Sequence, residues 1–203
     1  ESYSVRCEVA KNKKITKEFL ELLAKDESFY VRYEVAKHPN SNLKILEFLA
    51  KDESYLVRET VAANKKINLE IIKKLINDNN CSVRSQLFLN LRILLLEDKN
   101  NEEIKEIKEY LASSMNTHLD ILEKLAKDEY YSVRSKVAKN LNTTEEILEI
   151  LAKDESFMIR YEVTQNPNSN LETLEFLTKD KDKFVKHFAK ISFNKFKKNS
   201  LIK

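Results

Sequence analysis

The 203-residue sequence predicts an all-α protein, an α-solenoid of about eight two-helix repeats. A Val-Arg phrase recurs in blocks that begin at residues 1, 27, 53, 79, 103, 129, 155 and 181, spaced by 26 residues except for the fourth block, which has 24. Each block carries apolar residues at helical spacing. The chain has no glycine and two prolines, so the usual turn signals are missing. Self-similarity at this period indicates stacked supersecondary units in a single domain, residues 1–203.

The first helix of each block is expected after an acidic, serine-containing phrase. In the second block Val31 and Val35 form a core stripe at helical spacing. Ser28 or Asp26 is expected to cap this helix by accepting hydrogen bonds from its free backbone N–H groups. Pro39 disfavours helical backbone at the residue before it, so the helix is expected to end at an Asn/Pro turn.

The second helix is expected to begin with a capping box in two blocks, where Thr143 precedes Glu146 and Ser169 precedes Glu172. In the second block an apolar face follows over residues 45–50. A helix of about ten residues is about 15 Å long and only marginally stable alone. Each second helix must therefore stack on its neighbours.

The phrase VRYEVAKHPNSNLKILEFLAKD at residues 31–52 resembles the leucine-rich repeat variant family and, more loosely, HEAT-type repeats. The resemblance covers nearly the whole chain, through HPN at 38–40, NPN at 166–168 and the recurring V-R…V-A and L…L-A-x-D frames. It implies a right-handed superhelix whose first helices are short and either α or 3₁₀. The second helices begin with Ser, Thr or Asn where that family favours proline, which leaves both helices free to be α. No cysteine cluster accompanies the repeats, so the iron–sulfur module of some family members is not implied.

Composition excludes several classes of function. Without glycine there is no Gly-rich phosphate loop, dinucleotide fingerprint or glycine-flanked nucleophile elbow. Cys7 and Cys81 are too few for a disulfide framework, and the three histidines lie far apart, so no metal site or cofactor is expected. A reduced, cytoplasmic protein is the plain interpretation. The apolar run at 87–96 is half the length of a membrane span. Because Glu1 begins in register with the repeat, further residues are expected upstream.

Two rows of charge recur at fixed positions, counted from the first residue of each block. The cation row at position 6 is Arg6, Arg32, Arg58, Arg84, Lys108, Arg134, Arg160 and Lys186. The acid row at the last position is Asp26, Asp52, Asp78, Glu102, Asp128, Asp154 and Asp180. The cation row could bind a phosphate backbone, or the two rows could pair internally and fix the angle between repeats. The internal pairing is preferred, because the cations lie beside the core valines and a need shared by every copy is usually the need of the fold.

Residues that differ between copies are the better candidates for a partner surface. Positions 4 and 7 of the first helix share a face away from the valines, and they hold Tyr30, Tyr33, Leu56, Met158 and Tyr161. Exposed aromatic residues and methionine are typical of protein interfaces. The alternative for each residue is packing against the neighbouring helix layer.

Residues 79–128 lose the pattern, because no proline turn occurs and leucines run through 87–96. A longer or shifted helix is expected there, followed by a polar loop at 98–102. The segment could be a bend, a partner groove or a dimer patch, or a decayed repeat with buried leucines. The last is preferred, because large exposed apolar patches are rare on monomers.

The C-terminus concentrates positive charge. Residues 179–203 hold nine lysines and two aspartates, a net charge of +7, whereas the whole chain is +3, which leaves −4 for residues 1–178. This segment could bind nucleic acid or an anionic membrane surface as a basic amphipathic helix. Alternatively, residues 181–203 are a capping repeat that buries phenylalanines and exposes lysines. The cap is preferred.

The sequence therefore predicts a noncatalytic scaffold that binds another protein or peptide on an extended solenoid surface. The alternative is a nucleic-acid binder that uses the cation row and the basic C-terminus. A glycosylase built from HEAT-like repeats is disfavoured, because the chain has no tryptophan to stack on a base and no isolated acid to nominate. No catalytic residue is proposed, and the oligomeric state and the partner stay open.

Overall fold

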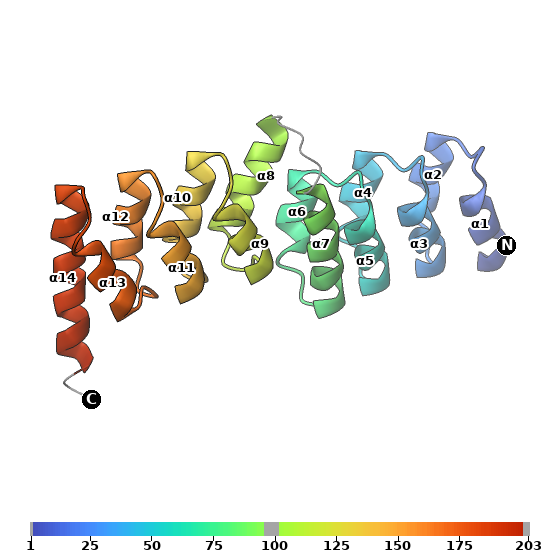
Figure 1. Cartoon of the computed structure of the whole chain (residues 1–203). Coiled ribbons are helices and arrows are strands. Elements are labelled where there is room, and N and C mark those ends of the chain that lie inside the picture. Colours follow the sequence, from blue (N-terminus) through green and yellow to red (C-terminus); the bar gives the residue numbers. More distant parts are fainter. Residues whose placement is uncertain (1, 96–101, 201–203) are drawn as a thin grey trace. The chain divides into compact units, whose positions relative to one another are not determined.

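The computed structural model describes residues 2–95 and 102–200, and these residues are all-helical, with fourteen helices and no strand (Figure 1). The first helices of the repeats are α1 (Tyr3–Lys11), α3 (Phe29–Lys37), α5 (Tyr55–Ala63), α7 (Cys81–Leu94), α8 (Glu102–Ser113), α10 (Tyr131–Lys139), α12 (Phe157–Gln165) and α14 (Lys183–Ser200). The second helices are α2 (Lys17–Leu23), α4 (Leu43–Leu49), α6 (Leu69–Leu75), α9 (Leu119–Leu125), α11 (Glu145–Leu151) and α13 (Leu171–Leu177). Both the first and the second helices are α-helices, so the first helices, expected to be either α or 3₁₀, are α.

The chain divides into two compact units, Glu1–Asp98 and Lys99–Lys203. In the first, α1 packs on α3, α3 on α5 and α5 on α7. In the second, α8 packs on α10, α10 on α12 and α12 on α14. Contacts therefore run from each repeat to its neighbours, as an α-solenoid requires. The predicted fold class is confirmed, whereas the repeat boundaries, the single domain and the handedness stay predictions.

Burial at equivalent positions shows the same dependence on neighbours. Val31 and Val35 of α3 are fully buried, as the repeat predicts. Val5 and Val9 hold the same positions of the repeat in α1, yet they are 52% and 43% exposed. No described helix precedes α1, whereas α1 itself covers α3. The preceding first helix thus contributes to burying the valine stripe of α3.

The hydroxyl groups just before the second helices close the turn instead of capping the next helix. Thr143 donates to the carbonyl of Val137 at 2.7 Å, and Ser169 donates to the carbonyl of Val163 at 2.5 Å. The N-caps are the next residues, Thr144 of α11 and Asn170 of α13. The predicted capping boxes at 143–146 and 169–172 were wrong, because each hydroxyl is buried and satisfies a carbonyl at the end of the first helix.

The first helices are capped less directly than predicted. Ser28 is the N-cap residue of α3, but its side chain makes no cap hydrogen bond. Instead its backbone N–H donates to Oδ1 of Asp26 at 2.9 Å. The carboxylate therefore orders the loop before the helix and does not cap the helix itself.

A row of asparagines at position 12 joins the ends of successive first helices. The Nδ2 of Asn166 donates to the carbonyls of Ala138 and Asn140 in the preceding repeat, at 2.7 and 3.1 Å. Equivalent bonds to the preceding repeat are made by Asn64, Asn90 and Asn140. These amides satisfy carbonyls that the helix C-termini leave unpaired.

The irregular segment contains a longer helix, as predicted. Helix α7 has 14 residues, whereas α1, α3 and α5 each have nine. Its leucines are only partly buried, because Leu87 and Leu91 are fully covered but Leu89 is 52% exposed. The polar loop predicted from residue 98 lies outside the described residues up to Glu102, where α8 begins.

At position 12 of the second repeat, His38 replaces the asparagine that joins successive first helices. The replacement leaves one buried polar atom without a hydrogen bond. The Nδ1 of His38 accepts the backbone N–H of Asn40 at 3.0 Å, but its buried Nε2 has no partner. An asparagine would keep the first bond and add donation to the preceding repeat, as Asn166 does. We expect His38→Asn to raise the free energy of unfolding by about 1 kcal/mol, measured by urea unfolding followed by circular dichroism.

The same substitution at the exposed His118 is the matched control, because asparagine also caps a helix such as α9. It should leave the free energy of unfolding nearly unchanged. An equal effect of both substitutions, or a loss of stability in His38→Asn, would contradict the assigned role of the position.

Candidate functional site

The structure pairs the cation row with the acid row inside each unit. Nε of Arg32 lies 2.6 Å from Oδ2 of Asp52, and its Nη2 lies 3.0 Å from Oδ1. The same two-pronged contact joins Arg6 to Asp26, Arg58 to Asp78, Arg134 to Asp154 and Arg160 to Asp180, with Nε–Oδ2 distances of 2.6–2.7 Å. The planar guanidinium fork matches the carboxylate, so each pair fixes orientation as well as distance.

The remaining guanidinium nitrogen, Nη1, binds the loop that precedes the arginine's own helix. Nη1 of Arg32 donates to the carbonyls of Asp26 and Glu27, at 2.7 and 3.0 Å. Arg58, Arg134 and Arg160 repeat this pair of bonds. Each of these arginines thus binds the loop before its own helix and the loop after the following helix.

The pairing also lowers the pKa of paired aspartates such as Asp26 and Asp78. The hydrogen bond from Arg6 lowers the pKa of Asp26. Burial pushes the pKa of Asp78 up, but hydrogen bonds from Arg58 and from the backbone of Asn80 outweigh it and lower the pKa overall. The ionised carboxylate is therefore the form that the fold stabilises.

Three members of the cation row differ from this pattern. Lys108 pairs with Asp128 through one contact of 2.9 Å. Arg84 donates to the carbonyl of Asp78 at 2.6 Å and has no ion pair to a described residue of its own unit. Lys186 of α14 is half-buried and forms no ion pair within the described part of the chain. Glu102, predicted in the acid row, pairs with Lys105 on its own helix.

Four of the five residues predicted to form a partner surface are half-buried, and the fifth is exposed. Tyr30 is 53% exposed, and its ring stacks on Tyr3 and contacts Phe29. The other four, Tyr33, Leu56, Met158 and Tyr161, are half-buried. The Tyr161 ring packs 4.8 Å from Phe184, between centroids. Tyr30 and Tyr161 thus contact rings of neighbouring first helices, and the role of all five residues in binding stays a prediction.

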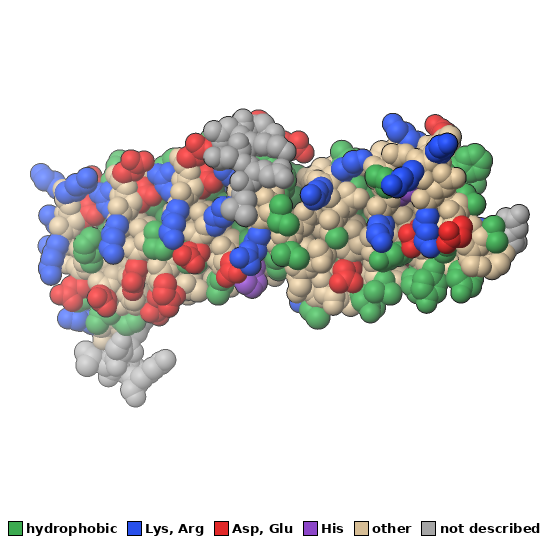
Figure 2. All heavy atoms as spheres, turned by 45° about the vertical axis from the view of Figure 1, so that its right-hand side comes forward, with side chains coloured by type: hydrophobic (Ala, Val, Ile, Leu, Met, Phe, Trp, Pro, Cys, Tyr) green, Lys and Arg blue, Asp and Glu red, His purple; other side chains and the backbone are tan. Residues whose placement is uncertain are grey.

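Three second helices also carry an exposed apolar side chain at position 22 of the repeat. Leu22 on α2, Phe48 on α4 and Phe176 on α13 are each at least half exposed. Over the C-terminal unit, Figure 2 shows rows of cationic and acidic side chains with apolar side chains between them. This row was not predicted from the sequence, although an apolar residue beside the buried stripe signals it.

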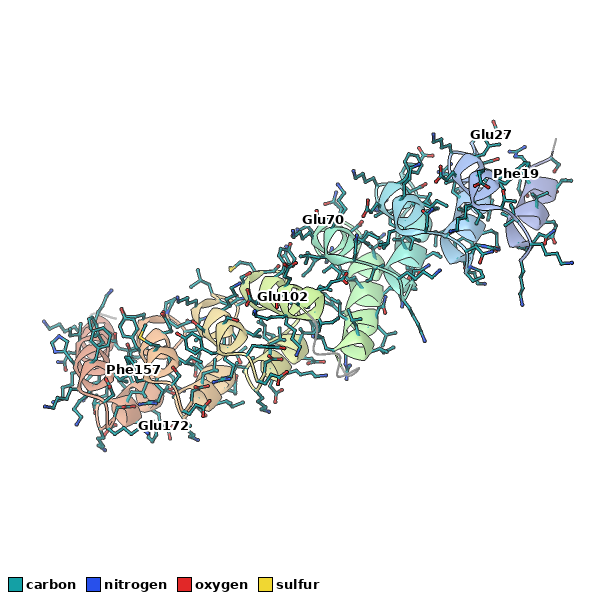
Figure 3. The ribbon with its side chains drawn as sticks, turned by 90° about the horizontal axis from the view of Figure 1, so that it is seen from above. Phe19, Glu27, Glu70, Glu102, Phe157 and Glu172 are labelled. Atoms are coloured by element: carbon teal, nitrogen blue, oxygen red, sulfur yellow. The ribbon has the colours of Figure 1, made fainter. Side chains whose placement is uncertain are left out.

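A groove lies between the loop after α11 and helix α13. It has a volume of about 650 Å³, and its accessible lining includes Lys153, Glu172, Glu175, Phe176, Lys179 and Lys181. A second hollow of about 170 Å³ shares Lys153, Glu172 and Phe176 with it. We call the two together the Phe176 groove. Figure 3 shows Glu172 on α13 and Phe157 on α12, which belong to the second-helix and first-helix layers respectively.

Two residues make the Phe176 groove different from its counterparts. Thr173 stands where isoleucine occurs in four other repeats, and its buried Oγ1, beside the smaller hollow, has no partner. Lys181 stands where Glu27, Glu53 and Glu155 add a second carboxylate to an arginine of the cation row. The groove therefore combines a half-exposed ring, both signs of charge and an unused hydroxyl.

Other kinds of site find no support in the described residues. Within 2–95 and 102–200, no group of three or more His, Cys, Asp or Glu side chains is placed to hold a metal ion. None of the helices there is long and apolar enough to cross a membrane. Cys7 is buried and Cys81 is exposed, and both are free thiols.

Comparison with known proteins gives a limited result. No family model matches the chain, and no curated protein matches it. A solved structure described as a leucine-rich repeat variant with a novel repetitive structural motif is 22% identical, with a TM-score of 0.42 over 88% of this chain and 72% of that one. The Escherichia coli protein YibA is 16% identical, with a TM-score of 0.35 over 94% of this chain and 73% of that one.

The Arg58–Asp78 pair should make stability depend on pH. The pKa of Asp78 is lower in the folded protein, so its contribution is present above the unfolded value of about 3.9 and is lost as the pH falls through the folded value. We expect Asp78→Asn to lower the free energy of unfolding by about 3 kcal/mol at pH 7, because it leaves a largely buried arginine without its counter-charge. The difference from the wild type should shrink below about pH 4. Urea unfolding at several pH values measures it.

Glu53→Gln is the control, because Glu53 contacts Arg32 at 2.9 Å but is 84% exposed. It should cost less than about 1 kcal/mol. If Asp78→Asn lowered the free energy of unfolding by the same amount at pH 7 and below about pH 4, the electrostatic origin of the loss of stability would be contradicted.

Proposed function

We propose that this protein is a noncatalytic scaffold that binds an extended peptide segment of another protein across its second helices. The observation that carries the proposal is the Phe176 groove, where a half-exposed ring lies among charges of both signs. Partner sites typically have an aromatic anchor surrounded by a polar rim. In a repeat protein, residues that depart from the repeat are the ones that the framework does not require.

Related grooves on other second helices support an extended occupant. One between α4 and α6, of about 420 Å³, is lined by Glu47, Lys51, Glu70 and Lys74 among others. The exposed Phe48 lies on α4 of the same pair. Within the C-terminal unit, a hollow of about 300 Å³ between α9 and α11 precedes the Phe176 groove. A segment with apolar residues between charged ones would therefore find a similar set of contacts at successive repeats there.

The cation row offers less support for a nucleic-acid scaffold. Five of its arginines are engaged by a carboxylate at two nitrogens, and four of these five also bind two carbonyls. Guanidinium groups already satisfied in this way gain little from a phosphate. The basic C-terminus is a separate surface.

Family and location are part of the same proposal. The phrase at 31–52 and its copies support kinship with leucine-rich repeat variant proteins. Two free cysteines support a reduced, cytoplasmic setting. The lack of a nominated catalytic group in the sequence supports a binding role.

Phage display of random peptides against the full chain tests the function. We expect enriched peptides to carry an aromatic or aliphatic anchor with charged residues on both sides, because the groove offers that pattern. Phe176→Ser should weaken the best peptide at least about tenfold, as removal of a central aromatic anchor does. Fluorescence anisotropy of the labelled peptide measures the affinity.

Phe157→Ser is the matched control, because Phe157 is 44% exposed but lies on the first helix α12. It should leave the affinity unchanged. Failure to enrich any peptide family, or an equal loss in both variants with their helical circular dichroism intact, would refute a peptide site at the Phe176 groove.

A further inference from the structure

The last helix carries a continuous polar stripe on its outer face. Helix α14 has 18 residues, twice the nine of α12, and Figure 1 shows it as the final helix of the C-terminal unit. Lys183, Lys190 and Lys197 recur every seven residues and so share one face, with His187 and Asn194 between them. All five are exposed. We call these five residues the α14 stripe, which is about 21 Å long at 1.5 Å per residue.

The charge of this stripe is not neutralised within the protein. Helix α14 contains no aspartate or glutamate. None of its described lysines forms an ion pair with another described residue, whereas surface lysines elsewhere pair repeatedly, as Lys11 does with Glu8 and Lys136 with Glu109. The neighbouring carboxylates are engaged elsewhere, since Asp182 accepts the N–H groups of Phe184 and Val185 and Asp180 binds Arg160. The face therefore attracts anions along its whole length.

Part of the apolar face of α14 is already used to close the stack. Val185 and Ala189 are fully buried, and α14 packs on both α12 and α13. The rings of Phe184 and Phe188 form a cluster with Tyr161, with centroids 4.7–5.0 Å apart. Helices that lie on membranes insert an apolar face into the lipid. Here the part of that face around Val185 and Ala189 is packed against protein, Phe184, Ile191 and Phe196 stay 39–50% exposed, and the centre of the exposed face is Lys, His and Asn.

We propose that the α14 stripe binds the phosphate backbone of duplex nucleic acid, independently of sequence. A duplex carries phosphates at short, regular intervals along a straight axis, about one charge per 1.7 Å. A straight row of lysines about 10.5 Å apart can reach several of them at once. Lysine side chains are flexible point charges that suit phosphates without reading bases. This surface is distinct from the Phe176 groove and does not depend on the peptide proposal.

The test measures binding of the full chain to a fluorescein-labelled duplex of random sequence by anisotropy, between about 50 and 200 mM salt. The variant replaces the three stripe lysines together, Lys183→Gln, Lys190→Gln and Lys197→Gln, which keeps good helix formers on the exposed face. We expect at least about a tenfold loss of affinity near 100 mM salt. The slope of log K against log salt should fall by about 2–3, since each phosphate contact contributes about 0.9.

The matched control removes the same charge from the first unit through Lys25→Gln, Lys51→Gln and Lys65→Gln, all exposed. It should keep most of the affinity and the slope. No salt-dependent binding by the wild type, or an equal loss in both triple variants, overturns the proposal. So does binding of the wild type to phosphatidylserine-containing vesicles with none to the duplex, which would assign the stripe to a membrane surface. A loss confined to the stripe variant, with unchanged circular dichroism, supports it.

Discussion

The arginine–aspartate pair is the interaction on which the rest of the structure depends. Arg32 reaches back to the loop before its own helix through two carbonyls and forward to the next loop through the carboxylate of Asp52. The same carboxylate accepts the backbone N–H of Ser54 and so shapes the start of α5. The chain has no glycine, the residue whose backbone adopts turn conformations most easily. The paired arginine and aspartate side chains order the loops through hydrogen bonds to the backbone instead. Such pairs add less to stability than to geometry, which in a solenoid is the relative position of successive repeats.

The asparagine row completes this framework at the opposite end of the first helices. The amide of Asn140, for example, binds the carbonyls of Ala112 and Ser114, while hydroxyls such as that of Thr143 close the following turn. Both ends of a first helix are therefore held by buried polar contacts to the preceding repeat. The second helices carry fewer such constraints, and their outer positions are free to vary. Exposed apolar residues such as Phe48 and Phe176 occupy such outer positions.

The repeated features of the fold could be predicted because each of them recurs in most of the eight blocks of one sequence. Two charged rows at constant positions indicate pairing before any distance is known. Single features could not be predicted as well. Thr143 and Thr144 can both cap a helix, and only their burial decides which one turns inward. The predicted partner residues at positions 4 and 7 depend on how closely first helices approach, as Tyr161 shows by packing on Phe184 and Phe188. The row at position 22 was not predicted, because a two-face pattern divides each second helix into buried apolar and exposed charged residues and has no place for an exposed apolar one.

The internal pairing also determines where charge can act outside the protein. The arginines would dominate a count of cations along the first helices, but each of the five paired ones is matched by an aspartate within 2.7 Å and contributes little at a distance. Residues 1–178 carry a net charge of −4, so the positive field belongs to the C-terminal segment alone. A cap requires only a polar outer face, and a mixture of both signs would serve it. Helix α14 instead presents lysines without a single acid. The requirements of the fold explain its buried valine and alanine, but they leave the sign of its exposed charge unexplained, and an anionic partner accounts for that sign.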